Sequence, residues 1–141
     1  MDLKSQLSNF ELSKELEKLG IKQDSLWYWV EFYSSSPTKK NTDLVYCEDL
    51  GLFANNPHLT EIKAFSAFTC AELGEMLPWC VKKKSEIPYY LEIKKVIVNV
   101  DEDEFQVGYF RGEKRLVMFL GKSLANALAK MLIYLKKNGF I

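Results

Sequence analysis

The 141-residue chain has little histidine, little arginine and no excess of either charge sign. Its one histidine, His58, lies in a turn-like segment, so the commonest general base and metal ligand is almost missing. Nineteen Asp and Glu balance nineteen Lys and Arg, of which only Arg111 and Arg115 are arginine. Because nucleic-acid-binding proteins usually carry a basic excess or a basic face, we do not expect binding to duplex nucleic acid.

Cysteine is also scarce and poorly arranged for a site. Cys47, Cys70 and Cys80 are an odd number, with no C-x-x-C pair and no histidine placed to complete a zinc site. We therefore expect free thiols in a reducing compartment, and neither a metal nor a cofactor.

Long apolar runs are missing as well. No run approaches the roughly twenty residues that a membrane-spanning helix needs, and the first four residues lack the apolar region of a signal peptide. We expect a cytoplasmic protein with no membrane contact. Hydrophobic residues make up 48% of the chain, which together with balanced charge excludes disorder and predicts one globular domain over residues 1–141.

Capping patterns predict three helices. Ser8-Asn9-Phe10-Glu11 has the form of a capping box, and Gly20 supplies a left-handed stop. A second capping box begins at Thr69 and opens a short helix that Pro78 closes. Gly74 inside it costs about 1 kcal/mol relative to alanine, so we expect a packing reason for it. The predicted helices cover about 9–19, the segment between Thr69 and Pro78, and about 124–137 after the cap Ser123.

Runs of β-branched and aromatic residues between turn signals predict strands. The predicted strands cover residues 26–33, 44–47, 60–68, 89–100, 105–110 and 115–120. The last three follow one another through short turns, which favours an antiparallel meander. We therefore predict an α+β fold with a mainly antiparallel sheet of about five or six strands, and with the N-terminal, middle and long C-terminal helices on one face.

No segment has the pattern of a catalytic site. Gly121-Lys122-Ser123 resembles the end of a phosphate-binding P-loop, but Leu116 stands where that motif requires glycine. The acidic run Asp101 to Glu104 reads as the solvated tip of a hairpin. We therefore expect no enzymatic activity.

The segment from Pro78 to Tyr90 places three lysines between aromatic residues. Aromatic rings and ammonium groups together suit a ligand with flat rings and negative charge, such as a nucleotide or single-stranded nucleic acid. The alternative is that Trp79 and one tyrosine pack inward while the lysines keep a loop soluble. The candidate residues are Trp79, Lys82, Lys83, Lys84, Tyr89 and Tyr90.

Trp27 is a further candidate, in the run Trp27-Tyr28-Trp29. Alternate residues of a strand point to opposite faces, so one face of this run can be core and the other a groove or partner surface. Burial of both faces, one of them beneath a helix, is the more common arrangement.

Four blocks of sequence carry a resemblance to known proteins. They are Leu16-Glu-Lys-Leu-Gly20, Ser25-Leu-Trp-Tyr-Trp-Val30, Phe68-Thr-Cys-Ala-Glu-Leu-Gly-Glu-Met-Leu-Pro78 and Ala125-Asn-Ala-Leu-Ala-Lys-Met-Leu-Ile-Tyr-Leu-Lys-Lys-Asn-Gly139. In this order they resemble the recurrent blocks of a family of small, uncharacterised bacteriophage and prophage proteins. The resemblance implies a phage setting and carries no catalytic residue, and residues 34–56 and 79–111 match no block.

These observations lead to two functional hypotheses. The first is a phage accessory protein in the host cytoplasm, a non-catalytic binding module that engages a host or phage protein. The alternative is a protein that binds a small ligand or nucleotide through the loop from Trp79 to Tyr90. The oligomeric state stays open, and an exposed edge of the meander could pair with a second copy in a dimer.

Overall fold

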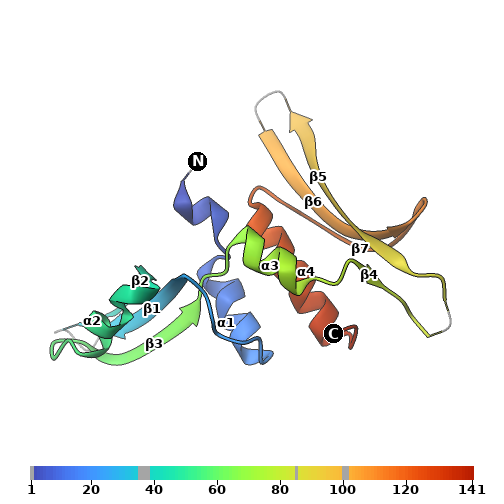
Figure 1. The fold of residues 1–141 in the computed structure, drawn as a ribbon. Coiled ribbons are helices and arrows are strands. Elements are labelled where there is room, and N and C mark those ends of the chain that lie inside the picture. Colours follow the sequence, from blue (N-terminus) through green and yellow to red (C-terminus); the bar gives the residue numbers. More distant parts are fainter. Residues whose placement is uncertain (1, 35–38, 85, 100–101) are drawn as a thin grey trace.

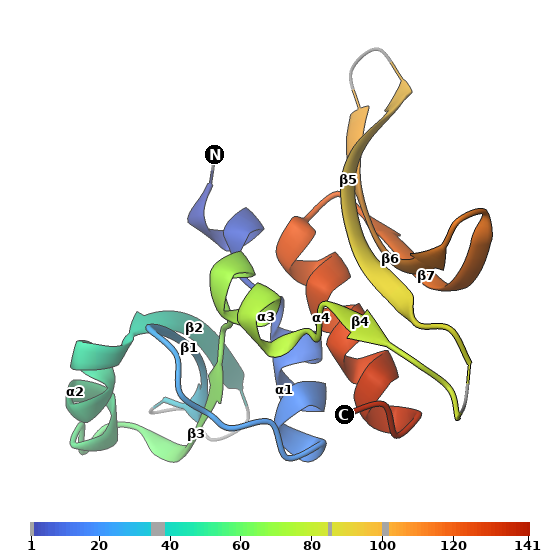
Figure 2. The same cartoon turned by 45° about the vertical axis from the view of Figure 1, so that its right-hand side comes forward.

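The computed structural model describes residues 2–34, 39–84, 86–99 and 102–141. It has an α+β fold in which helices lie between two antiparallel sheets (Figures 1 and 2). The α+β class, the antiparallel pairing and the three predicted helices are confirmed. The strands are divided between two sheets instead of forming one, because α1, α3 and α4 separate the first three strands from the last four.

The described residues form both helices and strands, with the following bounds. The helices are the 3-10 turns η1 (Leu3–Gln6) and η2 (Cys47–Asp49), and α1 (Phe10–Lys18), α2 (Leu50–Ala54), α3 (Cys70–Met76) and α4 (Leu124–Lys137). The strands are β1 (Trp27–Tyr33), β2 (Lys40–Tyr46), β3 (Thr60–Ser66), β4 (Cys80–Val81), β5 (Tyr89–Asn99), β6 (Glu102–Arg111) and β7 (Lys114–Gly121).

The first sheet has the order β2-β1-β3 and is covered on both faces. On one face, Phe10 of α1 packs edge-on against Trp29 and Phe65. On the other, Phe53 of α2 packs against Phe32 with ring centroids 5.4 Å apart. Helix α2 was not predicted, since residues 47–54 lack the apolar spacing of an amphipathic helix.

The second sheet has the order β4-β5-β6-β7, and α4 covers one of its faces. Alternate residues of β6, Val107 and Tyr109, are fully buried against α4, in which Leu128, Leu132 and other apolar residues face the core. The three-strand meander is confirmed, and β6 already begins at Glu102 within the acidic run that we predicted as a turn.

The predicted helix ends are confirmed in most details. Gly20 has a φ of 77°, and the N–H of Ile21 donates to the carbonyl of Leu16 at 3.1 Å, which is a Schellman cap. Thr69 and Glu72 form the complete capping box. The packing reason expected for Gly74 is absent, because a Cβ at this position would meet nothing within 4 Å among the described residues.

The N-terminus of α1 departs from the prediction in a way that matters for the fold. Asn9 caps this helix, and Ser8 turns inward, where it is fully buried. Its Oγ accepts from the N–H of Phe68 at 2.9 Å and lies 2.8 Å from the Oγ of Ser13. Its carbonyl accepts from the indole Nε1 of Trp29 at 2.8 Å, and its own N–H donates to the carbonyl of Phe68. Ser8 therefore joins α1, β1 and the segment that leads into α3.

We expect Ser8→Ala to lower the free energy of unfolding by about 1–3 kcal/mol, because the buried N–H of Phe68 and the hydroxyl of Ser13 would lose a partner. Urea unfolding monitored by circular dichroism measures this change. Ser5→Ala is the matched control, since the Ser5 hydroxyl is exposed and donates only to the nearby carbonyl of Asp2. Equal losses in the two variants would contradict the role assigned to Ser8.

Candidate functional site

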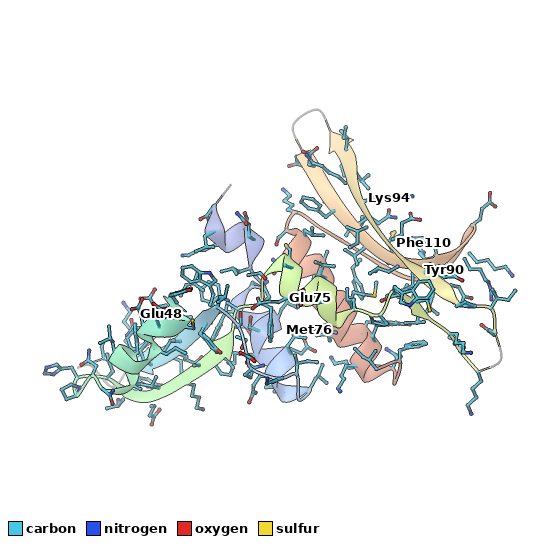
Figure 3. All side chains as sticks on the ribbon, viewed as in Figure 1. Glu48, Glu75, Met76, Tyr90, Lys94 and Phe110 are labelled. Carbon is cyan, nitrogen blue, oxygen red and sulfur yellow. The ribbon has the colours of Figure 1, made fainter. Side chains whose placement is uncertain are left out.

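Strand alternation divides the predicted site residues of the second sheet between two faces. Tyr89 is buried in the core beneath this sheet, whereas Tyr90 points to the opposite face and is 45% exposed. Tyr90 lies directly across from Phe110 of β6 in the strand register. Figure 3 shows Tyr90, Phe110 and Lys94 on this sheet. In the described part of the chain no helix covers the side turned away from α4 (Figure 2).

Trp79 lies at the start of this exposed surface. Its side chain is 73% exposed and packs against Tyr90, with ring centroids 5.5 Å apart and ring planes inclined by 42°. From Tyr90 the apolar surface continues across the sheet through the paired strands. We call this surface the outer face and define it by Trp79, which joins it through its ring contact with Tyr90, and by Tyr90, Phe110, Met118 and Leu120.

Gly108 gives the outer face its continuity. A Cβ at this position would lie 2.4 Å from the ring of Phe110 and 3.0 Å from the carbonyl oxygen of Val117. The missing side chain leaves room for the Phe110 ring over Gly108, which pairs with Met118 of β7 in the register. The sequence holds one signal for this surface in β7, which carries apolar residues on both faces (Val117 and Phe119, Met118 and Leu120) where a solvated face should alternate with polar ones.

Two residues of β6 hold the chain on either side of β4: Arg111 holds the loop that leads into β5, and Tyr109 holds Pro78, which precedes Trp79. The guanidinium of Arg111 lies 4.7 Å from the ring centre of Tyr89, and its Nη1 donates to the carbonyl of Ile87 at 2.9 Å. The hydroxyl of Tyr109 donates to the carbonyl of Pro78 on the other side of Trp79. Burial raises the pKa of the Tyr109 phenol, which therefore stays neutral and keeps donating at physiological pH.

The three lysines of the predicted site lie on the α4 side of the sheet. Lys82, Lys83 and Lys84 line a pocket of about 390 Å³ together with Tyr134 and Phe140. This pocket adjoins the C-terminal end of α4, where the helix dipole is negative and favours cations. The lysines thus complement a helix end, and they do not share a surface with Trp79 and Tyr90.

Trp27 lies in the first sheet, apart from the other candidates. It packs edge-on against Tyr46 of β2, with ring centroids 5.2 Å apart, and is partly buried. The structure therefore brings Trp79 and Tyr90 together, places Tyr89 beneath them in the core, and separates both Trp27 and the lysines from them.

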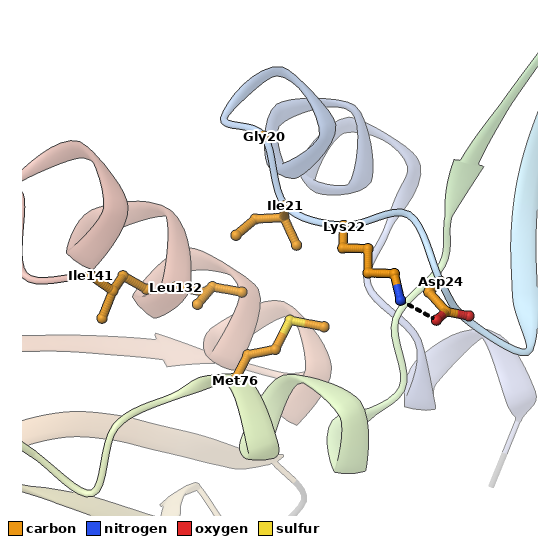
Figure 4. A pocket seen from close by; sticks show the side chains of 7 residues that line it. All are labelled: Gly20, Ile21, Lys22, Asp24, Met76, Leu132 and Ile141. Carbon is orange, nitrogen blue, oxygen red and sulfur yellow. Dashed lines mark hydrogen bonds and ion pairs between the residues drawn. The ribbon is translucent and has the colours of Figure 1, made fainter.

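A second pocket, of about 480 Å³, lies between the end of α1, α3 and α4 (Figure 4). Ile21, Met76 and Leu132 form its apolar wall. Its charged groups are Lys22 and Asp24, an ion pair with Nζ and Oδ2 2.9 Å apart. The hydrogen bond to Asp24 raises the pKa of Lys22. Since both charges are paired and exposed, the pocket offers apolar contact but no acid, base or nucleophile aimed inward.

Within the described ranges, no three His, Cys, Asp or Glu side chains converge as a metal site. No helix in these ranges is both long and apolar enough to cross a membrane. Comparison with known proteins gives no match to a family model, a curated protein or a solved structure.

We expect Arg111→Ala to loosen the loop that carries Lys82 to Lys84, because it removes both the contact with Tyr89 and the hydrogen bond to Ile87. Limited trypsin digestion should cleave this loop about tenfold faster than in the wild type, the factor expected when local opening becomes about 1.4 kcal/mol easier. Arg115→Ala, at an exposed position of β7, should leave the rate unchanged. An unchanged rate in Arg111→Ala would contradict the fastening role.

Proposed function

We propose that this chain is a non-catalytic binding module that engages another protein through the outer face. The observation that carries the proposal is the exposed pair Trp79 and Tyr90, from which apolar side chains continue over β5, β6 and β7. A tryptophan exposed to 73% at the head of such a surface costs solubility and contributes little to the core.

The composition of the outer face supports a protein partner. Energetically dominant residues of protein interfaces are enriched in tryptophan and tyrosine and are ringed by polar groups that exclude water. Here the ion pair of Glu92 and Lys94 stands on the same face as Tyr90, beside the apolar strip. Trp79 and Tyr90 would act as anchors, and the fastened backbone beside Pro78 and Ile87 would hold them ready for docking.

The resemblance to bacteriophage proteins gives this proposal its setting. In that setting the module acts in the cytoplasm of an infected host, on a host protein or on another phage protein. The outer face does not suit a nucleotide, because Lys82, Lys83 and Lys84 lie on the other side of the sheet and Lys94 is paired with Glu92. A nucleotide-binding function of the Trp79 to Tyr90 loop is therefore the second candidate.

Photo-crosslinking from position 79 tests the proposal. We expect Trp79→benzoylphenylalanine to give one defined adduct in a lysate of the host bacterium, because Trp79 is the most exposed aromatic residue of the outer face. Leu52 offers a matched control: it is equally exposed, at 73%, and lies on α2 beside the other sheet. Leu52→benzoylphenylalanine should not give the same adduct.

Competition with unlabelled protein makes the result specific. Excess wild type or Leu52→Ala should abolish the adduct, whereas the double variant Trp79→Ala/Tyr90→Ala should compete at least about tenfold less well, as expected for the loss of interface anchors. The same adduct from both positions, or no adduct from position 79, would refute the proposal.

A further inference from the structure

A buried carboxylate in the first sheet organises a second group of lysines. Glu31 of β1 is only 5% exposed and faces α1. Its Oε1 lies 2.9 Å from the Nζ of Lys40, and its Oε2 lies 3.7 Å from the Nζ of Lys14. The hydrogen bond to Lys40 lowers the pKa of Glu31 against the opposing effect of burial, so the carboxylate is charged at neutral pH.

This carboxylate fixes two ammonium groups without using up their hydrogen-bonding capacity. An ammonium group carries three donors, and the contact with Glu31 occupies one on Lys40. Lys14 is held further by the rings of Phe10 and Phe65, whose centres lie 5.0 Å and 5.8 Å from its Nζ. The ammonium groups of Lys14 and Lys40 are thus held in place before any ligand binds, and each keeps N–H donors that the contact with Glu31 does not use.

Two more lysines complete a pocket around Glu31. Lys18 follows Lys14 by one helical turn on α1, and Lys63 of β3 lies directly across from Glu31 in the strand register. Neither appears in the ion pairs of the described residues. The pocket has a volume of about 440 Å³, and its charged lining consists of Lys14, Lys18, Lys40, Lys63, Glu17 and Glu31.

The lining therefore carries four positive and two negative charges, a local charge of +2 in a chain whose net charge is zero. Outside the lining, Glu61 is close enough to Lys40 to raise its pKa. Glu31 pairs with Lys14 and Lys40. An anion that enters the pocket would therefore interact mainly with the ammonium groups of Lys18 and Lys63. A volume of this size falls in the range of small-molecule sites, which is about 300–1,000 Å³.

We propose that this pocket binds a small phosphate-bearing anion, with Lys18 and Lys63 contacting the phosphate oxygens and Glu31 acting as a positioning residue for Lys14 and Lys40. Multiply charged phosphate groups match several convergent ammonium donors better than a single carboxylate does. The pocket lies on the first sheet and the outer face on the second, so the experiments on the two sites are independent of each other.

The test is a titration of the folded protein with inorganic pyrophosphate, followed by two-dimensional NMR of the backbone amides. We expect saturable shifts centred on Lys14 to Lys18, Glu31 and Lys63, with a dissociation constant below about 1 mM, which corresponds to a modest site. Lys18→Gln/Lys63→Gln should weaken binding at least about tenfold by removing two charges. Both lysines are exposed, so the fold should survive the substitutions.

The chain supplies its own control. Lys82→Gln/Lys83→Gln removes the same charge from the pocket at the end of α4 and should leave the affinity unchanged. A parallel titration with ATP identifies the source of the phosphate: tighter binding than that of pyrophosphate indicates a nucleotide, and weaker binding indicates a polyphosphate. Shifts that do not saturate, shifts centred on Lys82 to Lys84, or equal weakening by the two double variants would overturn the proposal.

Discussion

The hydrogen bonds of Ser8 are the interaction on which the arrangement of this protein depends. Ser8 is fully buried and bonds to Phe68, to Ser13 and to the indole of Trp29, so one residue joins α1, β1 and the entry to α3. An isolated bridge between Leu7 and Thr69 lies beside it. Because these bonds connect the first sheet to the helical layer, and α4 of that layer packs on the second sheet, they fix the two sheets relative to each other. A buried N–H or hydroxyl without a hydrogen-bond partner would lower the free energy of unfolding, so the chain favours the one arrangement in which Ser8, Ser13 and Phe68 are all paired.

Two unlike surfaces follow from the separation of the sheets. The second sheet turns Trp79, Tyr90 and Phe110 to the outside, a surface suited to another protein. The first sheet turns Glu31 toward α1 and gathers four lysines around it, a pocket suited to a phosphate. Equal totals of acidic and basic residues conceal this local excess of positive charge. The proposed phosphate site and the proposed protein-binding surface thus lie on different sheets of the same chain.

Local sequence signals predict most of the helices and strands, whereas the division into two sheets and the grouping of the side chains depend on long-range contacts. Thr69, Gly20 and Ser123 mark helix ends through bonds to near neighbours, so the sequence predicts them well. The division into two sheets depends on which strands α4 separates, which no local pattern contains. Tyr89 and Tyr90 illustrate the limit within the candidate site: alternation predicts that they face opposite ways, but not that Lys82 to Lys84 lie at the end of α4. The lysines around Glu31 come from three elements distant in sequence, so only the fold reveals them.

The central claim is that Trp79 is open to solvent in the free protein and is covered by a protein partner. Fluorine NMR of the chain labelled with 5-fluorotryptophan, in the presence of a soluble gadolinium chelate, measures this directly for each of the three tryptophans. We predict strong broadening of the Trp79 resonance in the free protein and little for Trp29, whose indole is bonded to Ser8. Addition of the partner should protect Trp79 and leave Trp27 unchanged. A Trp79 that is shielded in the free protein, or that broadens equally with and without the partner, would contradict the account.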